Sequence, residues 1–238
     1  MRVVLWNCKG GLKNEDKVKY LLDFQPDIAV IPEIRESHVQ ALNPQDSCWV
    51  TNHPSSKAPK GLGVLCFGIY RIERLPRDEE MEIFLPLRIH GGPQPFNLLA
   101  FWNFYHLCKH GRFRGAKREA GVELAALRHY RSFLADPSLF IGDLNMGPTL
   151  SLPNFSRVAA VLEEIGLKDL SCIKPQRSSD ASHWKTFRMR RNEKIFYHHL
   201  DHAFGSAFFV KQFSSFQVDE KAMEIFSDHA PVVLEFMM

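Results

Sequence analysis

The chain has 238 residues, 30 Lys plus Arg against 27 Asp plus Glu, and a formal net charge of only +3 at pH 7. Hydrophobic residues make up 45% of it and aromatic residues 12%, which favours a packed globular protein and excludes disordered and fibrous chains. Length alone does not decide between one large domain and two small ones, so the order of the predicted elements must do so.

The first half of the chain alternates apolar runs with turn signals. A buried strand is predicted at residues 2–7, followed by a short helix that stops before Pro26 and a strand at residues 28–33. Segments rich in Pro, Gly, Ser and charge separate the next apolar runs. These runs predict strands at residues 48–50, 62–67, 81–89 and 96–102.

The second half combines two helices with further strands. Apolar residues recur every three or four positions between residues 116 and 136, which predicts a long amphipathic helix. A strand follows at residues 139–145, and a second helix around residues 158–165 is closed by Gly166. The remaining strands are predicted at residues 185–189, 194–204, 208–216 and 231–236.

Strands dominate both halves, and each half has one or two helices. This order predicts a single domain over residues 1–238, an α/β sandwich of two sheets packed face to face with helices outside. A boundary near residues 146–154 is conceivable because MGPTLSLPN is rich in Gly, Pro and Ser. We interpret this segment as a loop of the active site, since it directly follows the polar motif FIGDLN.

Cysteine usage and hydropathy bear on the compartment. The five cysteines are widely spaced and form no CxxC motif, so neither a disulfide framework nor a cysteine zinc site is indicated. No stretch approaches the ~18 apolar residues of a transmembrane helix, and the run in MRVVLW is too short for a signal peptide. We expect a soluble, cytoplasmic protein with no membrane partner and no obligate protein partner.

Five short stretches end in side chains that can bind a metal ion or a phosphate. They contribute Asn7, Glu33, the pair Asp143 and Asn145, Asp201, and the pair Asp228 and His229. All but the first lie within or just past an apolar run, so a strand-rich core is expected to aim them at one place. Carboxylates, amides and an imidazole together are the composition of a metal-assisted phosphoester hydrolase.

Two of these motifs have a direct chemical explanation. Glu33 leaves a buried strand and offers the hard oxygen that Mg²⁺ prefers, so we assign it as the principal metal ligand. Asp143 and Asn145 lie two residues apart and would project to the same side of a sheet. Alone, Glu33 would be interpreted as a solvated strand end and Asp143 as a turn residue that caps the backbone. Because Glu33 and Asp143 belong to a set of five such motifs, we favour a metal-binding or catalytic role for both.

The blocks WNCKGG, PDIAVIPE, FIGDLN, LDHAF and SDHAPV occur in this order between residues 3 and 236. In order and separation they resemble the endonuclease/exonuclease/phosphatase superfamily, which includes deoxyribonuclease I and the exonuclease III abasic-site endonucleases. The resemblance implies a four-layer αββα sandwich of two mostly antiparallel sheets flanked by helices. It also implies an active site at one rim and Mg²⁺ or Mn²⁺ as the cofactor.

The resemblance further implies roles. Asp143 would orient or deprotonate the attacking water, and Asn145 would donate to a nonbridging phosphate oxygen. His229 would protonate or stabilise the pentacovalent phosphate, with Asp201 as the orienting partner that raises the pKa of the imidazole. Asp228 would help to hold the metal. The family's amide near the metal, here Asn7, would bond a phosphate oxygen or hold Asp143.

The chain departs from the family pattern at two positions. Lys9 stands where the abasic-site endonucleases carry an acidic residue, so a second carboxylate ligand is missing there. Phe101, Trp102 and Asn103 occupy the strand where relatives place a Tyr or His, and none of them can act as an acid or base. Either residues of the following loop reach inward instead, namely Tyr105, His106, Lys109 and His110, or the enzyme relies on His229 and the metal alone.

The motif HHLDH admits a second interpretation. On a helix, His198 and His202 would meet on one face as zinc ligands. On a strand, His199 and Asp201 share one face while His198 and His202 share the other. We favour the strand, with His199 as a neighbour of the phosphate.

Two basic runs, residues 109–118 and 185–194, flank the site in sequence. The residues assigned to the substrate are Arg112, Arg114, Arg188, Arg190 and Arg191. Guanidinium groups can pair with successive phosphates, as nucleic-acid binding requires, although a charge run can also be a solvated face.

The leading function is therefore a metal-dependent nuclease in which water attacks a phosphodiester in line, with DNA favoured over RNA. The alternatives are a phosphatase or phosphodiesterase for a small-molecule or lipid-linked phosphate, and a noncatalytic binding protein. A nuclease should have an open groove that is continuous with the basic runs, and a small-molecule enzyme should have a closed pocket.

Overall fold

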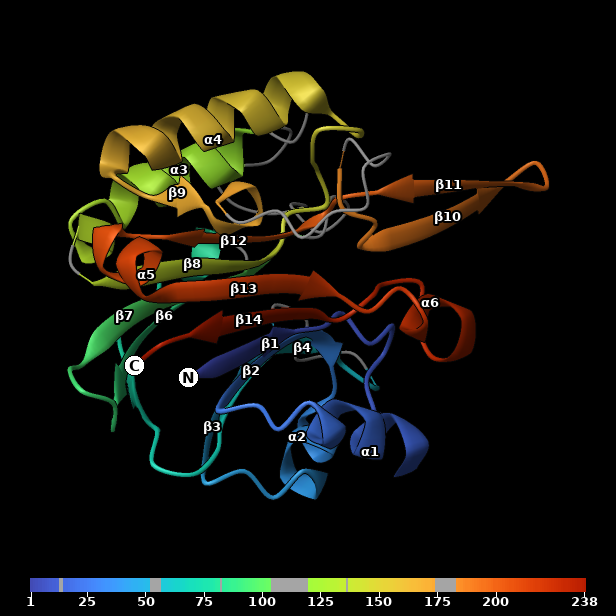
Figure 1. Ribbon diagram of the computed structural model, residues 1–238, viewed down its shortest axis with the longest axis horizontal. Helices are drawn as coiled ribbons and strands as arrows, with labels where there is room; N and C mark the ends of the chain where they lie inside the picture. Colours follow the sequence, from blue (N-terminus) through green and yellow to red (C-terminus); the bar gives the residue numbers. More distant parts are fainter. Residues whose placement is uncertain (13–14, 52–56, 82, 104–119, 136, 174–182) are drawn as a thin grey trace.

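The computed structural model describes residues 1–12, 15–51, 57–81, 83–103, 120–135, 137–173 and 183–238. Two six-stranded sheets face each other, with helices on the outer side of each (Figure 1). The first sheet has the order β13-β14-β1-β2-β4-β3, and only β1 and β2 run parallel. Its strands are β1 (Arg2–Leu5), β2 (Ile28–Ile34), β3 (Asp46–Val50), β4 (Gly61–Cys66), β13 (Phe213–Val218) and β14 (Val232–Phe236).

The second sheet has the order β5-β6-β7-β8-β12-β9, and only β7 and β8 run parallel. Its strands are β5 (Arg71–Arg74), β6 (Ile83–His90), β7 (Phe96–Trp102), β8 (Ser138–Asp143), β9 (Lys168–Asp169) and β12 (Asp201–Gly205). A separate hairpin of β10 (Phe187–Arg191) and β11 (Lys194–His198) projects from the sandwich (Figure 1). The predicted sandwich of two mostly antiparallel sheets is confirmed.

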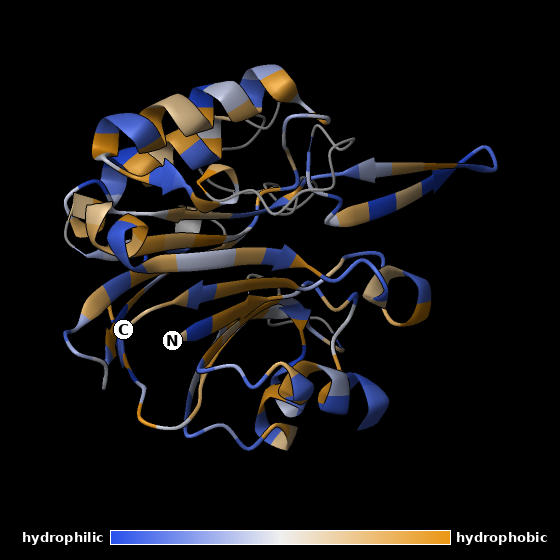
Figure 2. Ribbon diagram, in the orientation of Figure 1, coloured by the Kyte–Doolittle hydropathy of each residue, from blue (hydrophilic) through white to orange (hydrophobic). Residues whose placement is uncertain are grey.

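The layers explain the apolar runs of the sequence. All residues of β4 and β7 are buried, because the inner face of each sheet packs on the other sheet and the outer face packs on helices. Helices α1 (Glu15–Asp23) and α2 (Glu36–Ala41) cover the first sheet, and α3 (Gly121–His129) and α4 (Leu152–Ile165) cover the second. Figure 2 shows the strands mostly apolar and the outer helices mixed in polarity. No helix in the described part of the chain is long and apolar enough to cross a bilayer.

Three predicted elements have different bounds in the structure. The helix expected at residues 116–136 is shorter, since α3 ends at His129, where Tyr130 leaves helical dihedrals, and a 3-10 turn follows at Phe133–Ala135. Residues 116–119 lie outside the described residues. The strand expected at 208–216 is helix α5 (Ala207–Gln212) followed by β13, because a short apolar run does not distinguish a helix from a strand.

The third difference concerns the motif HHLDH. Residues 194–204 form two strands instead of one, because β11 pairs with β10 in the hairpin while β12 pairs with β8 in the second sheet. Residues 199–200 connect the two strands.

Two further helix features follow the sequence. Gly166 ends α4 as predicted, with a left-handed φ of 98° and its N–H directed to the carbonyl oxygens of Leu162 and Glu163. A short helix α6 (Ala222–Ile225) precedes the motif SDHAP.

Candidate active site

The predicted polar residues meet at one rim of the sandwich because the strands that carry them end there. Asn7 follows β1, Glu33 lies near the end of β2, and Asp143 is the last residue of β8. Asp201 begins β12 and stands directly opposite Asp143 in the antiparallel pair of β8 and β12. The register of two strands thus places two carboxylates side by side, as the strand-end pattern led us to expect.

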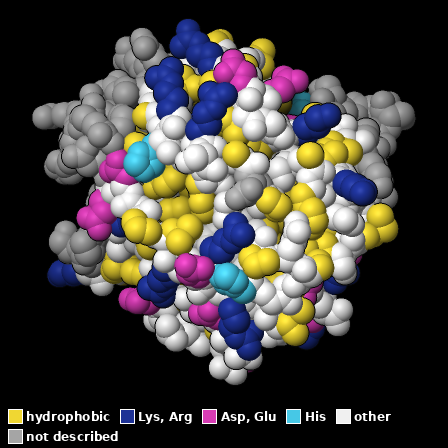
Figure 3. All heavy atoms as spheres, turned by 90° about the vertical axis from the view of Figure 1, so that its left-hand side faces the viewer, with side chains coloured by type: hydrophobic (Ala, Val, Ile, Leu, Met, Phe, Trp, Pro, Cys, Tyr) yellow, Lys and Arg dark blue, Asp and Glu magenta, His cyan; other side chains and the backbone are white. Residues whose placement is uncertain are grey.

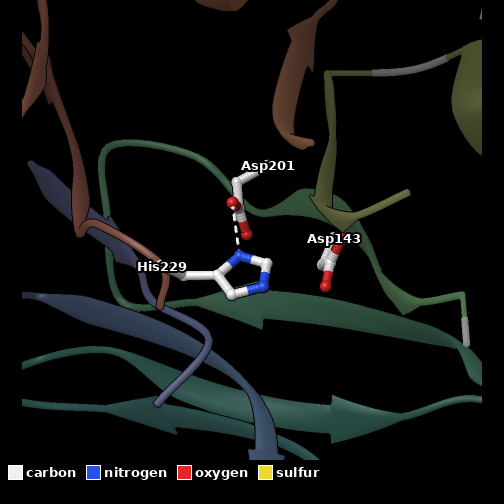
Figure 4. A group of neighbouring side chains, drawn as sticks. All are labelled: Asp143, Asp201 and His229. Carbon is white, nitrogen blue, oxygen red and sulfur yellow. Dashed lines mark hydrogen bonds and ion pairs between the residues drawn. The ribbon is translucent and has the colours of Figure 1, made fainter. Parts of the chain in front are cut away.

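Asp143, Asp201 and His229 form a buried cluster at the centre of this rim (Figure 4). Both carboxylate residues are 0% exposed and His229 is 4% exposed. The Nδ1 atom of His229 lies 2.8 Å from Asp201 Oδ2, and one potential ligand atom from each of the three residues lies within 4.8 Å of the others. The predicted contact between His229 and its orienting carboxylate is therefore present.

Two neighbours fix the backbone of His229. The indole Nε1 of Trp6 donates to the carbonyl oxygen of His229 over 3.0 Å, and the N–H of His229 donates to Ser227 Oγ over 3.2 Å. Ser227 in turn donates to the carbonyl oxygen of Asn7 over 2.8 Å. The turn that carries the imidazole is thus tied to the end of β1, so the ring is oriented before any ligand arrives.

Burial and charge shift the pKa values of this cluster. Burial by itself lowers the pKa of His229, but attraction and hydrogen bonding to Asp201 outweigh it and raise the pKa to about 9. Burial and the neighbouring charge of Asp201 raise the pKa of Asp143 to about 7, although His229 and hydrogen bonds act the other way. Near neutral pH the histidine is therefore protonated and the Asp143 carboxyl is poised between its two forms.

Asn7 and Asn145 hold the carboxylate of Asp143. Asn7 Nδ2 donates to Asp143 Oδ2 over 3.0 Å and to Glu33 Oε1 over 3.2 Å. The backbone N–H of Asn145 donates to Asp143 Oδ1 over 2.8 Å, and its Nδ2 donates to Asp143 Oδ2 over 3.1 Å and to the carbonyl oxygen of Asn103 over 2.7 Å. Of the two roles predicted for Asn7, the structure contains the contact that holds Asp143. Both amide protons of Asn145 already have protein acceptors, so donation to a phosphate requires it to exchange one of them.

The outer part of the site pairs each carboxylate with a lysine. Glu33 Oε2 lies 2.6 Å from Lys60 Nζ, and Asp228 Oδ2 lies 2.9 Å from Lys9 Nζ. The Glu33 and Asp228 side chains are 15% and 28% exposed, so solvent and ions reach them. Lys9, Glu33 and Asn145 have left-handed backbone φ angles of 47°, 60° and 50°. The lysine at position 9 thus lies against the carboxylate that was predicted to help hold the metal.

The donor atoms fit a hard divalent cation. Glu33 and Asp143 share the amide of Asn7, and Asp201 Oδ1 is buried with no hydrogen-bond partner among the described residues. Carboxylate oxygens are the ligands that Mg²⁺ and Mn²⁺ prefer. Within the described residues, Asp143, Asp201 and His229 are the one group of three close enough to share an ion. His229 Nδ1 already contacts Asp201, and this contact raises the pKa of the ring, which favours a proton-transfer role for His229 at neutral pH.

The three histidines of HHLDH lie beside the site. His198 Nδ1 contacts Thr149 Oγ1 at 3.1 Å, and His202 Nε2 contacts the carbonyl oxygen of Met146 at 2.9 Å. Burial lowers the pKa of both rings. His199 is 2% exposed and stacks on His202. Among the described residues no group of three ligands includes these histidines, so the zinc interpretation has no support in the structure.

The basic hairpin adjoins the site. The N–H of Arg188 donates to the carbonyl oxygen of Asp228 over 2.7 Å, and Phe187 forms a β-bridge with His229. A cavity of about 470 Å³ lies between hairpin and site, lined by Lys9, Phe187, Arg188, Met189, Arg190, Ile195 and Asp228. Arg191 ends β10 and is exposed. Arg112, Arg114 and the loop candidates Tyr105, His106, Lys109 and His110 lie outside the described residues.

Sequence reasoning missed three contributors to the site. Lys60 precedes a buried strand after a turn-rich segment, and nothing local signals its ion pair with a residue 27 positions away. Thr186 Oγ1 accepts from the backbone N–H groups of Leu200 and Asp201. In the sequence, Thr186 is one residue of a basic run, and nothing there indicates this contact. Glu123, on the buried face of α3, bonds Asn103. Its position on an otherwise apolar helix face is the one signal that could have revealed it.

No protein-family model and no curated protein sequence matches the chain. Solved structures do match. The endonuclease domain of TRAS1, a telomere-specific non-LTR retrotransposon, superposes with a TM-score of 0.70 at 15% identity, covering 100% of this chain and 98% of that one. A 3'-5' exonuclease from Neisseria meningitidis (TM-score 0.69, 18% identity) and an AP endonuclease from Archaeoglobus fulgidus (TM-score 0.70, 14% identity) each match over 100% of both chains. The chain therefore has the fold predicted from its resemblance to endonuclease/exonuclease/phosphatase proteins.

Proposed function

We propose that the chain is a divalent-metal-dependent phosphodiester hydrolase that acts on nucleic acid, with DNA favoured over RNA. The observation that carries the proposal is the buried cluster of Asp143, Asp201 and His229, in which the pKa values of the Asp143 acid and the imidazole lie at about 7 and about 9. At neutral pH one group can accept a proton and the other can donate one, as in-line attack of water on a phosphodiester requires. A noncatalytic binding protein would have no need of this arrangement.

We assign proton transfer and metal binding to different residues of the site. Asp143 accepts a proton from the attacking water, and His229, oriented by Asp201, donates to the phosphate oxygens or the leaving group. We assign the metal to Glu33, to Asn7, whose Nδ2 contacts Glu33, and to Asp228, none of which belongs to the group of Asp143, Asp201 and His229. When bound, the ion would neutralise charge on the phosphate. Mg²⁺ and Mn²⁺ are the ions that this oxygen-rich set suits.

A nucleic-acid substrate is supported by the hairpin of β10 and β11. Arg188, Arg190 and Arg191 lie on β10, and the cavity beside them opens next to Asp228. On the opposite face of the molecule, shown in Figure 3, basic and acidic side chains are interspersed. A run of guanidinium groups that adjoins the metal carboxylates suits a chain of phosphates better than a single one. The contribution of His199 to phosphate binding stays a prediction that its burial does not favour.

Three structural neighbours point the same way, since those proteins are an endonuclease domain, an exonuclease and an AP endonuclease. A phosphatase or phosphodiesterase for a small or lipid-linked phosphate is the second candidate, because one fold serves many substrates. Its only specific support is the size of the 470 Å³ cavity, which suits a small ligand. Domain count and a reducing, cytoplasmic location stay predictions from the sequence.

The test is a substrate panel. Labelled single- and double-stranded DNA and RNA are incubated with Mg²⁺ or Mn²⁺ and compared with inositol phosphates and sphingomyelin, with Asp143→Asn as the inactive control. We expect EDTA-sensitive cleavage of DNA. Hydrolysis confined to the small phosphates would favour the second candidate, and failure on every substrate would contradict the proposal.

A further inference from the structure

The end of β7 contains a buried polar contact that the proposed chemistry does not explain. Asn103, 5% exposed, directs its side-chain amide to the carboxyl group of Glu123, which is 3% exposed and lies in the first turn of α3. The same amide lies 3.5 Å from the carbonyl oxygen of Leu144. Glu123 has no ion-pair partner among the described residues, and burial raises its pKa to about 7. Burying a carboxyl group costs stability unless it is hydrogen-bonded, and the amide of Asn103 supplies that hydrogen bond.

The backbone of Asn103 is part of the candidate active site. Its N–H donates to the carbonyl oxygen of Asp143 over 2.9 Å, and its carbonyl oxygen accepts from Asn145 Nδ2 over 2.7 Å. Asn145 Nδ2 also donates to Asp143 Oδ2. The side chain of Asn103 is therefore anchored to α3, while its backbone is anchored to the two residues that carry the proposed base and its neighbouring amide.

We propose that Asn103 and Glu123 are a positioning pair for the proposed hydrolysis. Glu123 fixes the end of β7, so that the carbonyl oxygen of Asn103 holds the amide of Asn145 beside Asp143. The inference rests on the proposed function, because the geometry it protects is that of the proposed base.

The pair acts on Asn145 through one hydrogen bond, so a small displacement is the expected result of removing it. Glu123→Ala should lower kcat by about 10- to 100-fold with KM little changed, since a misplacement of about 1 Å near a reacting centre costs up to ~10²-fold. Glu123→Gln keeps an oxygen that accepts from Asn103 and should retain most of the activity. Val122→Ala is the matched control, because Val122 is a buried neighbour on the same turn that packs in the apolar core. It should lose a similar amount of thermal stability and keep kcat.

A second measurement does not depend on activity. The side-chain amide signals of Asn145, assigned by their loss in Asn145→Asp, should move in the ¹⁵N–¹H spectrum of Glu123→Ala. They should stay in place in Glu123→Gln and Val122→Ala. If Glu123→Ala and Val122→Ala had the same kcat and the same Asn145 side-chain amide signals, the positioning role of Asn103 and Glu123 would be overturned. Loss of activity in Glu123→Gln equal to that in Glu123→Ala would show that the charge or the acidic proton of Glu123 is needed, and it would also overturn the positioning role. A wild-type protein that hydrolyses none of the substrates would contradict the proposed function. The Asn145 amide signals would still test whether Glu123 positions the amide of Asn145.

Discussion

The inner and outer parts of the candidate site balance their charges in different ways. The inner part, Asp143, Asp201 and His229, is closed to solvent, and within it the imidazole pairs with Asp201. The outer part is partly open, and each of its carboxylates faces a lysine: Glu33 faces Lys60, and Asp228 faces Lys9. Burial strengthens electrostatic coupling, while a partly exposed ion pair is screened and exchanges easily with ions from solution.

Under the proposed function, this difference predicts that the inner part binds protons and the outer part binds cations and phosphates. A closed cluster with shifted pKa values responds to protons, because changing one charge there changes the others. An open carboxylate paired with a lysine responds to cations and phosphates, because a divalent ion can replace the ammonium on the acid. Proton transfer and metal binding should therefore be separable by mutation.

The largest expected effect comes from the inner part. Asp143→Asn and His229→Ala should each lower kcat by ~10²–10⁴-fold or more, since each removes a proton-transfer group. Asp201→Asn should have a smaller effect because Asp201 acts through the ring. The control is His90→Ala, which removes a histidine–carboxylate pair of 2.9 Å with Glu73 on the surface. Single-turnover rates on one labelled substrate measure all four variants, and wild-type rates in either of the first two would place the chemistry elsewhere.

The next effect tests the outer part. Glu33→Gln keeps the shape of the side chain but loses the charge, so we expect weaker Mn²⁺ binding by calorimetry and loss of most activity at limiting metal. High metal concentration should recover part of the rate, which it cannot do for Asp143→Asn. Glu235→Gln is the control, because Glu235 pairs with Arg2 away from the site. Unchanged Mn²⁺ affinity in Glu33→Gln would remove Glu33 from the ligand set.

The pH dependence should report the inner part alone. kcat/KM should rise as Asp143 loses its proton and fall as His229 loses its own. In the metal-free protein these pKa values lie at about 7 and about 9, and a bound cation should move both limbs to lower pH. Asp201→Asn removes the main attraction that raises the pKa of His229, so the upper limb should move to lower pH. A profile measured at saturating metal that is flat from about pH 6 to about pH 10 would contradict these assignments.

The smallest effect per residue is expected on the hairpin. Replacing Arg188, Arg190 and Arg191 by Ala should reduce the slope of log affinity against log salt by roughly 0.7–0.9 for each phosphate that the protein no longer neutralises. Hydrolysis of a small activated phosphodiester should change less than cleavage of DNA, because a small substrate has no neighbouring phosphates for the hairpin arginines to neutralise. Fluorescence anisotropy with labelled DNA gives the slope. An unchanged slope would assign the arginines to a solvated face and favour the small-substrate candidate.

Much of the site could be predicted from the sequence because its residues sit where strands end. Glu33, Asp143 and Asp201 lie at the ends of apolar runs or within them, and the register of β8 and β12 then brings the last two together. Partners contributed by unrelated segments could not be predicted in this way. Lys60 reaches the site through a tertiary contact that leaves no local pattern, and Glu123 leaves only its place on an otherwise apolar helix face, which does not reveal its partner.

The errors in secondary structure have a similar origin. HHLDH forms the crossing between a hairpin and a sheet, and the strand-like run of residues 194–204 contains no Gly, Pro or Asn to indicate that the chain changes partner there. The segment FFVKQ of α5 is short, and its apolar residues fit the period of a helix as well as that of a strand. Its helical conformation therefore depends on tertiary packing, in which Phe209 is 0% exposed.

The left-handed backbone at Lys9, Glu33 and Asn145 has a consequence for how this protein can change. Such dihedrals are unfavourable for residues with a Cβ atom, and strained backbone at functional sites costs on the order of 1–3 kcal/mol per residue, less for Asn. Glycine would relieve that cost at each of the three positions. At Glu33 and Asn145, the two of these positions with a proposed role, stability and activity therefore favour different residues. A lineage selected only for a stable fold would accumulate glycine there and lose the proposed site while keeping the fold.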